Sequence, residues 1–226
     1  MKLNKRSSSF RQLRHDATAR ILVDAAEAIL VRQGFDRVTM RDIAAQAGCA
    51  TGTIYLYFKT KQQVLDVITE RHSDALLQRL DAVLALPERP LEKLRQITCE
   101  VIAYFTRNRG VIQLLRTGDR MELSTLPDAL QESVKQRWDE FLAAELELFR
   151  AAQKQGELRR DFPPEQIQQV LYLLMMGLRD EVANHAPLPA EEELDRMIWG
   201  LFLGGAAGPG KKTRSKPKRR TRAKPS

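Results

Sequence analysis

The apolar positions of the chain first become periodic between residues 16 and 33. They recur at steps of three and four residues, which is the spacing of one face of an α-helix. These positions are Ile21, Leu22, Ala25, Ala26, Ile29 and Leu30. Gly34 follows them, as glycine often does at a helix end, so the pattern predicts an amphipathic helix over 16–33 with Phe35 packed beneath it.

Two shorter helical patterns come next. Thr39 precedes the first of them, and its hydroxyl can accept a hydrogen bond from a free backbone N–H, so we predict that it is the N-cap. The apolar positions of this helix are Ile43, Ala44 and Ala47. Gly48 ends it, and the second helix is predicted over residues 50–58. Two short helices joined by a tight turn that contains glycine form a helix-turn-helix.

Helical periodicity continues to about residue 204, without the alternation that is typical of strands. A long helix is predicted over residues 60–86, before Pro87. Glycine and proline divide the remainder into further helices. Their predicted spans are 91–107, 109–117, 127–155, 163–185 and 190–204. The fold class is therefore predicted to be all-α.

A chain of 226 residues is long enough for two small domains with separate cores. We predict a basic arm over residues 1–15, a helix-turn-helix domain over 16–61 and a larger helical domain over 62–205. The helix over 60–86 connects the two domains. Residues 206–226 have too few apolar side chains to bury and are predicted to be a disordered basic tail.

The net charge of +8 is distributed unevenly along the chain. Residues 1–61 hold 11 Lys/Arg against 5 Asp/Glu, residues 62–210 hold 17 against 24, and residues 211–226 hold 9 Lys/Arg and no acidic residue. A basic head on an acidic body indicates that the head approaches phosphate while the body is repelled by it.

Features missing from the sequence exclude several classes of protein. No apolar run approaches the roughly 18 residues of a membrane span, so no membrane partner is expected. No apolar segment typical of a secretory signal follows the N-terminus, and Cys49 and Cys99 lack disulfide or metal-site spacing, which favours a cytoplasmic location. His15, His72 and His185 are scattered, and no nucleophile or phosphate-loop motif is present, so neither an enzyme nor a cofactor is expected.

The predicted helix-turn-helix carries a recognisable motif. Residues 38–48 read VTMRDIAAQAG, and residues 52–61 read GTIYLYFKTK. Together with the helix before them, they resemble the DNA-binding signature of the TetR repressors over roughly residues 17–66. The resemblance implies a three-helix DNA-binding domain, a helical ligand-binding and dimerisation domain, and a repressor that a small apolar effector releases from its double-stranded operator DNA.

The second helix of a helix-turn-helix lies in the major groove, while flanking groups hold phosphates. Thr51, Gly52 and Thr53 occupy the first turn of that helix, and Thr51 is the first candidate for contact with a base. By resemblance to the family, the predicted phosphate anchors are Thr39, Tyr55, Tyr57 and Lys61. For Tyr57, a role in packing is the alternative.

Three positions depart from the usual family pattern. Ala50 stands where a hydroxyl N-cap is common, so the helix either relies on Thr51 or loses about 1 kcal/mol of capping. Cys49 replaces a small aliphatic residue and is expected to behave as one. Leu56 stands where a polar residue that contacts phosphate is frequent, which leaves either contact with a thymine methyl group or no role in DNA binding.

The helices beyond residue 90 carry more apolar residues than one core-facing stripe needs. This surplus predicts an apolar ligand pocket between helices, with ordinary core packing as the alternative for each residue. The candidates are Tyr104, Phe105, Leu115, Trp138, Phe141, Leu142, Tyr172 and Met175.

The last two helices combine large apolar residues with Gly177 and Gly200, which allow close approach of helices. By analogy with TetR relatives, this pair implies a homodimer, and twofold symmetry would place two recognition helices at operator half-sites about 34–36 Å apart. We expect movement of the helix over 60–86 to transmit effector binding to the DNA-binding domain.

Two other functions stay open at this point. A non-specific, nucleoid-type DNA-binding protein would explain the basic tail, although not the acidic, apolar-rich body. Within the resemblance, a regulator of fatty-acid metabolism that senses acyl-CoA is the other alternative.

Overall fold

The computed structural model describes residues 17–116, 128–184 and 187–206, so the predicted arm and almost all of the predicted tail lie outside the described residues. The described part forms nine α-helices, which confirms the all-α prediction. They are α2 (Ala17–Gln33), α3 (Met40–Gln46), α4 (Thr51–Tyr57), α5 (Lys61–Leu84), α6 (Pro90–Arg107), α7 (Arg109–Arg116), α8 (Asp128–Gln155), α9 (Pro164–Ala183) and α10 (Glu191–Ala206). Each begins and ends within two residues of its predicted span.

Helix ends form where the local chemistry predicts them. Gly34 and Gly48 follow α2 and α3 with φ values of 84° and 68°, a left-handed conformation that glycine adopts without strain. The Thr39 side chain accepts from the Asp42 backbone N–H, which confirms Thr39 as the N-cap of α3. Thr60 caps α5 in the same way, through the backbone N–H of Gln63.

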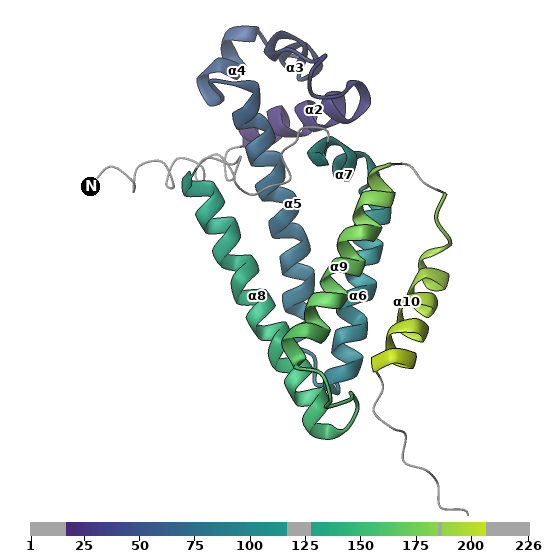
Figure 1. The fold of residues 1–226 in the computed structure, drawn as a ribbon. Coiled ribbons are helices and arrows are strands. Elements are labelled where there is room, and N and C mark those ends of the chain that lie inside the picture. The colour runs from purple at the N-terminus through teal and green to yellow at the C-terminus, as the bar shows by residue number, and fades with distance from the viewer. Residues whose placement is uncertain (1–16, 117–127, 185–186, 207–226) are drawn as a thin grey trace, which may run out of the picture.

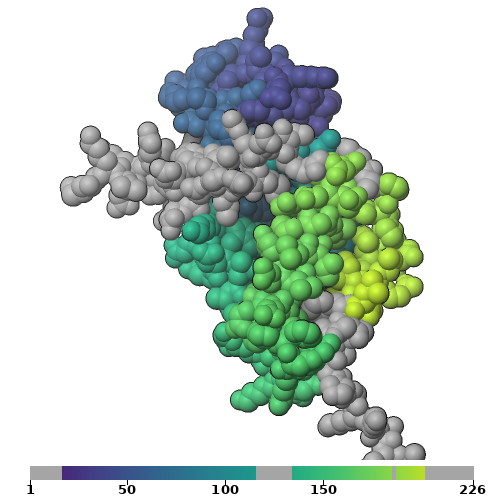
Figure 2. Space-filling view, in the orientation of Figure 1, coloured from purple at the N-terminus to yellow at the C-terminus, as the bar shows by residue number. Residues whose placement is uncertain are grey.

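The helices gather around two apolar cores. Helices α2, α3 and α4 build the first core at one end of the molecule (Figures 1 and 2), together with Val64, Val67 and Ile68 of α5. Helices α5, α6, α8, α9 and α10 supply most of the second. Further along α5, Leu76, Leu77, Leu80 and Val83 belong to this second core. The first core thus continues past residue 61, and α5 belongs to both.

Helix α7 is a second link between the cores. Its Leu114 is buried in the first core, while Ile112 is buried in the second. The helix lies beneath α2 in Figure 1, and this packing explains Gly110. A Cβ atom on Gly110 would lie 2.5 Å from Cγ1 of Val31 in α2, so the two helices meet where one of them has no side chain.

None of the helices in the described ranges is both long and apolar enough to span a bilayer.

We predict that Gly110→Ala lowers the free energy of unfolding by about 1–3 kcal/mol, because the β-branched Val31 side chain has little freedom to rotate away from the new methyl group. Chemical denaturation would measure the loss. Adding Val31→Ala removes the obstructing atoms and should restore most of the stability. A double variant no more stable than Gly110→Ala alone would contradict this account of the α2–α7 contact.

Candidate DNA interface

Helix α4 turns one continuous stripe away from the protein. Ile54 and Phe58 anchor its inner face with 0% and 1% of their surfaces exposed. Gly52, Tyr55 and Leu56 are exposed on the other side. Lys59 is exposed just beyond the end of α4, and its Nζ reaches back to donate to the Tyr55 carbonyl oxygen. We call Gly52, Tyr55, Leu56 and Lys59 the α4 stripe. Because it lies on the outer side of the second helix of the helix-turn-helix, it is the surface available to a groove.

The first turn of α4 has no side-chain cap. Ala50 is the N-cap residue, and its side chain makes no capping hydrogen bond. Of the two alternatives raised by Ala50, loss of the cap is therefore the one found. Thr51 and Thr53 are half-buried at the flanks of the α4 stripe, and the Thr53 N–H donates to the Ala50 carbonyl oxygen over 2.8 Å. Their contacts with bases stay a prediction.

Thr39 has a definite structural role besides its predicted phosphate contact. Its hydroxyl donates to the Asp42 carboxylate over 2.6 Å, and its backbone N–H donates to the same oxygen over 2.9 Å. These hydrogen bonds hold the pKa of Asp42 below its ordinary value. The exposed Thr39 hydroxyl already gives its proton to Asp42, so contact with a phosphate oxygen would require that proton to be redirected.

Lys61 is turned inward, which the sequence did not indicate. Its Nζ donates to the carbonyl oxygen of Val38 over 2.7 Å and to that of Phe35. The ammonium also lies 4.2 Å from the centroid of the Phe35 ring. Lys61 therefore ties the start of α5 to the turn between α2 and α3. Two of its three donors are used inside the protein, and its contact with phosphate stays a prediction.

Lys59, which sequence reasoning did not select, is better placed for a phosphate. It is exposed at the end of α4, where its Nζ donates to the Tyr55 carbonyl oxygen over 2.7 Å. A positive charge there is favoured by the helix dipole and lies on the α4 stripe. Its position at the helix end was a usable signal. Tyr57 is half-buried with its ring centroid 6.5 Å from that of Phe58, which supports its alternative role in packing.

A polar cluster joins the DNA-facing end to the larger helical body. Arg71 of α5 pairs with Asp24 and Glu27 of α2. His72 Nε2 lies 3.1 Å from Glu27 Oε2, and His72 Nδ1 lies 2.6 Å from the Tyr104 hydroxyl of α6. Burial by itself raises the pKa of Glu27, but the bonds and charges of His72 and Arg71 outweigh burial and lower it. We call these five residues the junction cluster.

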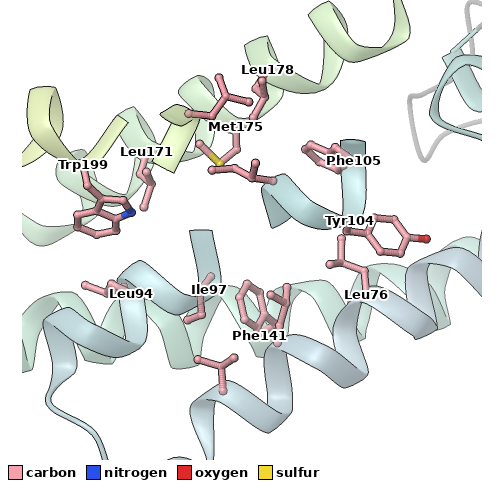
Figure 3. Packing of buried hydrophobic residues seen from close by; sticks show 14 of the residues in the cluster. Leu76, Leu94, Ile97, Tyr104, Phe105, Phe141, Leu171, Met175, Leu178 and Trp199 are labelled. Atoms are coloured by element: carbon pink, nitrogen blue, oxygen red, sulfur yellow. The ribbon is translucent and has the colours of Figure 1, made fainter. Parts of the chain in front are cut away.

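Most candidates for the apolar pocket lie together in the second core. Tyr104, Phe105, Phe141 and Met175 are buried there, and Trp138 and Leu142 pack against them. In Figure 3 the Phe105 ring is turned towards Met175 and Leu178, whereas the Tyr104 hydroxyl points away from these apolar groups. Tyr104 thus belongs to the second core through its ring and to the junction cluster through its oxygen.

Tyr172 requires a correction. It is 49% exposed, next to Leu173 and Leu174, which are 59% and 46% exposed on the outer side of α9. Its neighbour Leu171 takes the core-facing position of this turn, with 3% exposed. Tyr172 therefore does not face the apolar group around Phe141. Leu115 is half-buried and lies outside both cores as described.

Sequence reasoning missed a buried carboxyl group in the same domain. Glu145 of α8 is 8% exposed and accepts a hydrogen bond from Gln168 Nε2 over 2.8 Å. Burial raises its pKa, and the bond from Gln168 only partly opposes this. The signal was present in the sequence, because Phe141, Glu145 and Phe149 follow one another at steps of four residues on one helix face.

Comparisons with known proteins agree with this geometry. Residues 22–68, which span the helix-turn-helix, match the model of the family described as bacterial regulatory proteins, tetR family. An HTH-type transcriptional regulator of Haemophilus influenzae, described as uncharacterized, is 26% identical over 176 residues, which cover 78% of this chain and 86% of that protein.

Two further proteins are similar to this chain, one in sequence and one in fold. The nucleoid occlusion factor SlmA of Cronobacter sakazakii is 27% identical over 119 residues, 53% of this chain and 59% of that protein. The fold is similar to that of the transcriptional regulator FadR of Bacillus subtilis, solved in complex with stearoyl-CoA. The TM-score is 0.64 at 19% identity, over 82% of this chain and 98% of that one.

Lys59 and Lys61 form a matched pair for a test by substitution. We predict that Lys61→Ala lowers the free energy of unfolding by about 1.5–3 kcal/mol through lost charge-assisted hydrogen bonds, whereas Lys59→Ala changes it by less than about 0.5 kcal/mol. For DNA binding, Lys59→Ala should reduce the slope of log affinity against log salt by about 0.9. A slope reduced by Lys61→Ala and not by Lys59→Ala would instead make Lys61 the phosphate contact.

Proposed function

The chain belongs to the TetR family of bacterial regulatory proteins and is a DNA-binding transcription regulator, and we propose that it represses transcription until a small apolar effector releases it from its operator. The observation that carries this proposal is the α4 stripe, a solvent-facing surface on the second helix of a helix-turn-helix at one end of the molecule. A helix placed in this way can enter a major groove while the acidic body stays clear of the phosphates.

The contacts proposed within the operator follow from the geometry of the stripe. Gly52 and Tyr55 face the groove, with Thr51 and Thr53 at the flanks. Lys59 holds a phosphate at the end of the helix. Gly52 supports close approach to DNA, because a Cβ atom there would meet no protein atom within 4 Å, and its φ is not in the left-handed region. Neither internal packing nor backbone conformation requires this glycine, so an external partner is its best explanation.

We propose a homodimer through α9 and α10. Both helices pack on α6 and are visible on the same face of the molecule in Figure 2. The two helices carry many exposed apolar side chains, and Gly177 and Gly200 are exposed as well. The exposed side chains are Val170, Tyr172, Leu173, Leu174, Met197 and Leu201. Burial of this surface against a second copy would bring two α4 stripes to one twofold operator.

The effector is proposed to bind among the apolar side chains of the second core near Phe105, Phe141 and Met175. A group inserted there would displace α6, whose Tyr104 reaches the junction cluster through His72. His72 lies on α5, and its contact with Glu27 leads to α2 in the DNA-binding domain. Effector binding would thereby change the distance between the two recognition helices and weaken operator binding.

An acyl-CoA is the second candidate for the class of effector. The observation that favours it is the similarity of fold to FadR of Bacillus subtilis, which was solved with stearoyl-CoA. On this hypothesis the acyl chain would occupy the apolar interior of the second core, and the chain would regulate fatty-acid metabolism.

A non-specific, nucleoid-type role stays an alternative, and one relative is described as a nucleoid occlusion factor. The match to SlmA of Cronobacter sakazakii spans about three fifths of that protein. Selection of binding sites from a random DNA pool separates the two functions, because an operator-specific repressor returns a twofold consensus, whereas non-specific packaging returns none.

We predict that Gly52→Ala stabilises the protein and weakens DNA binding at the same time. Alanine is the better helix former and meets no obstacle in the protein, so the free energy of unfolding should rise by up to about 1 kcal/mol. The added methyl group lies on the α4 stripe and should lower operator affinity by roughly 1–3 kcal/mol. Denaturation and operator titration measure the two effects, and unchanged operator affinity would remove Gly52 from the interface.

We predict reciprocal coupling between effector and operator. A panel of apolar compounds that includes stearoyl-CoA would be titrated into the protein with and without the selected operator. An inducer should lower operator affinity about 5- to 150-fold, and the operator should lower inducer affinity by the same factor. Tyr104→Phe removes only the hydroxyl, and with it the contacts to Nδ1 and to the carbonyl oxygen of His72, and it should retain inducer binding but reduce this factor. If every compound that binds the protein does so with the same affinity in the presence and absence of the operator, the proposed release is contradicted.

A further inference from the structure

Leu56 is the most exposed large apolar side chain described in the DNA-binding domain, with 77% of its surface accessible. A single exposed leucine on an ordinary surface needs no explanation. Leu56, however, lies within the α4 stripe, between Gly52 one turn before it and Lys59 at the helix end. Its side chain is therefore directed to the surface proposed to enter the major groove.

The chemistry of the groove restricts what Leu56 can contact favourably. A leucine side chain has neither a donor nor an acceptor. Among the base edges of the major groove, only thymine presents an apolar group, its C5 methyl, whereas G·C pairs present donors and acceptors. Leucine against a G·C pair would keep water from those polar atoms without replacing their hydrogen bonds, which is unfavourable. Leucine against thymine removes two apolar groups from water.

The position of Leu56 relative to Gly52 also fits a base contact. The two residues are four positions apart on one face, which corresponds to about 6 Å along the helix axis. Base pairs are stacked about 3.4 Å apart. If Gly52 allows the start of α4 to approach the groove floor, Leu56 reaches an edge at most about two base pairs away, the distance depending on the angle between the helix and the DNA axis.

We propose that Leu56 is a specificity-determining residue that contacts the C5 methyl group of one thymine in each operator half-site. The proposal rests on the proposed function, since it requires α4 to lie in the major groove of an operator. It adds the chemical identity of one base that the protein reads. It also resolves the two alternatives left by the unusual residue at this position.

Replacement of thymine by deoxyuridine tests the proposal, because deoxyuridine lacks only the methyl group. Each thymine pair related by the twofold axis of the selected operator would be replaced in turn, and affinity for the full-length protein measured. At one thymine pair, replacement should lower the affinity of the protein for the operator. The expected loss is about fourfold for each methyl group removed, or about 16-fold for both half-sites, because one buried apolar carbon is lost per contact. The other thymine pairs should change affinity less than twofold.

The variant Leu56→Ala provides the second half of the experiment. It should bind the thymine and deoxyuridine operators equally at the sensitive pair, because the partner of the methyl group is gone. Leu56→Met keeps an apolar side chain and should retain discrimination. Tyr55→Phe alters a neighbour on the same stripe, so it should change affinity for the thymine and deoxyuridine operators by the same factor and leave the ratio between them unchanged. Since Leu56 is exposed, these variants are not expected to impair folding.

The outcomes separate this proposal from the proposed function. If no thymine pair is sensitive in the wild-type protein, or if Leu56→Ala keeps the full sensitivity, Leu56 does not read a methyl group, although operator binding itself stands. If the selection returns no consensus at all, the proposed operator-specific repressor fails, and the assignment of Leu56 is overturned with it.

Discussion

The structure depends on the burial of α5 in two different cores. Val64 and Ile68 near its start pack with the helix-turn-helix, and Leu77 and Leu80 further along pack with the larger helical body. A helix is a rigid element whose hydrogen bonds lie within its own backbone, so a displacement of one half moves the other. The two domains are consequently separate in their cores but mechanically connected.

The remaining contacts at this junction restrict how α5 can move. Helix α7 inserts Leu114 into one core and Ile112 into the other. The junction cluster connects α2, α5 and α6 through Glu27, His72 and Tyr104. Apolar packing resists separation of the domains, while directional hydrogen bonds favour one orientation of them. The proposed release by an effector needs this combination, because the DNA-binding state must be well defined and yet open to displacement by a modest binding energy.

At the DNA-facing end, neighbouring residues have different roles. Ile54 and Phe58 hold α4 from below, and Lys61 closes the turn between α2 and α3 by donating to carbonyl oxygens. These internal roles fix the orientation of the helix. The residues between and beside them, such as Leu56 and Lys59, are left without a packing role and are available to a partner. Residues that stabilise the fold therefore alternate along the sequence with residues that are proposed to contact DNA.

Local chemistry by itself determined which elements this chain forms. Periodic apolar positions, the Thr39 cap and the glycine after each short helix predicted every described helix to within two residues, because these signals act over one or two turns. Only the tertiary structure decided where particular side chains point. Lys61 donates to Phe35 and Val38, more than 20 residues earlier, and Tyr172 faces outward because Leu171 takes the core position. The directions of these side chains depend on which surfaces folding brings together. The helical period of the sequence does not encode that information.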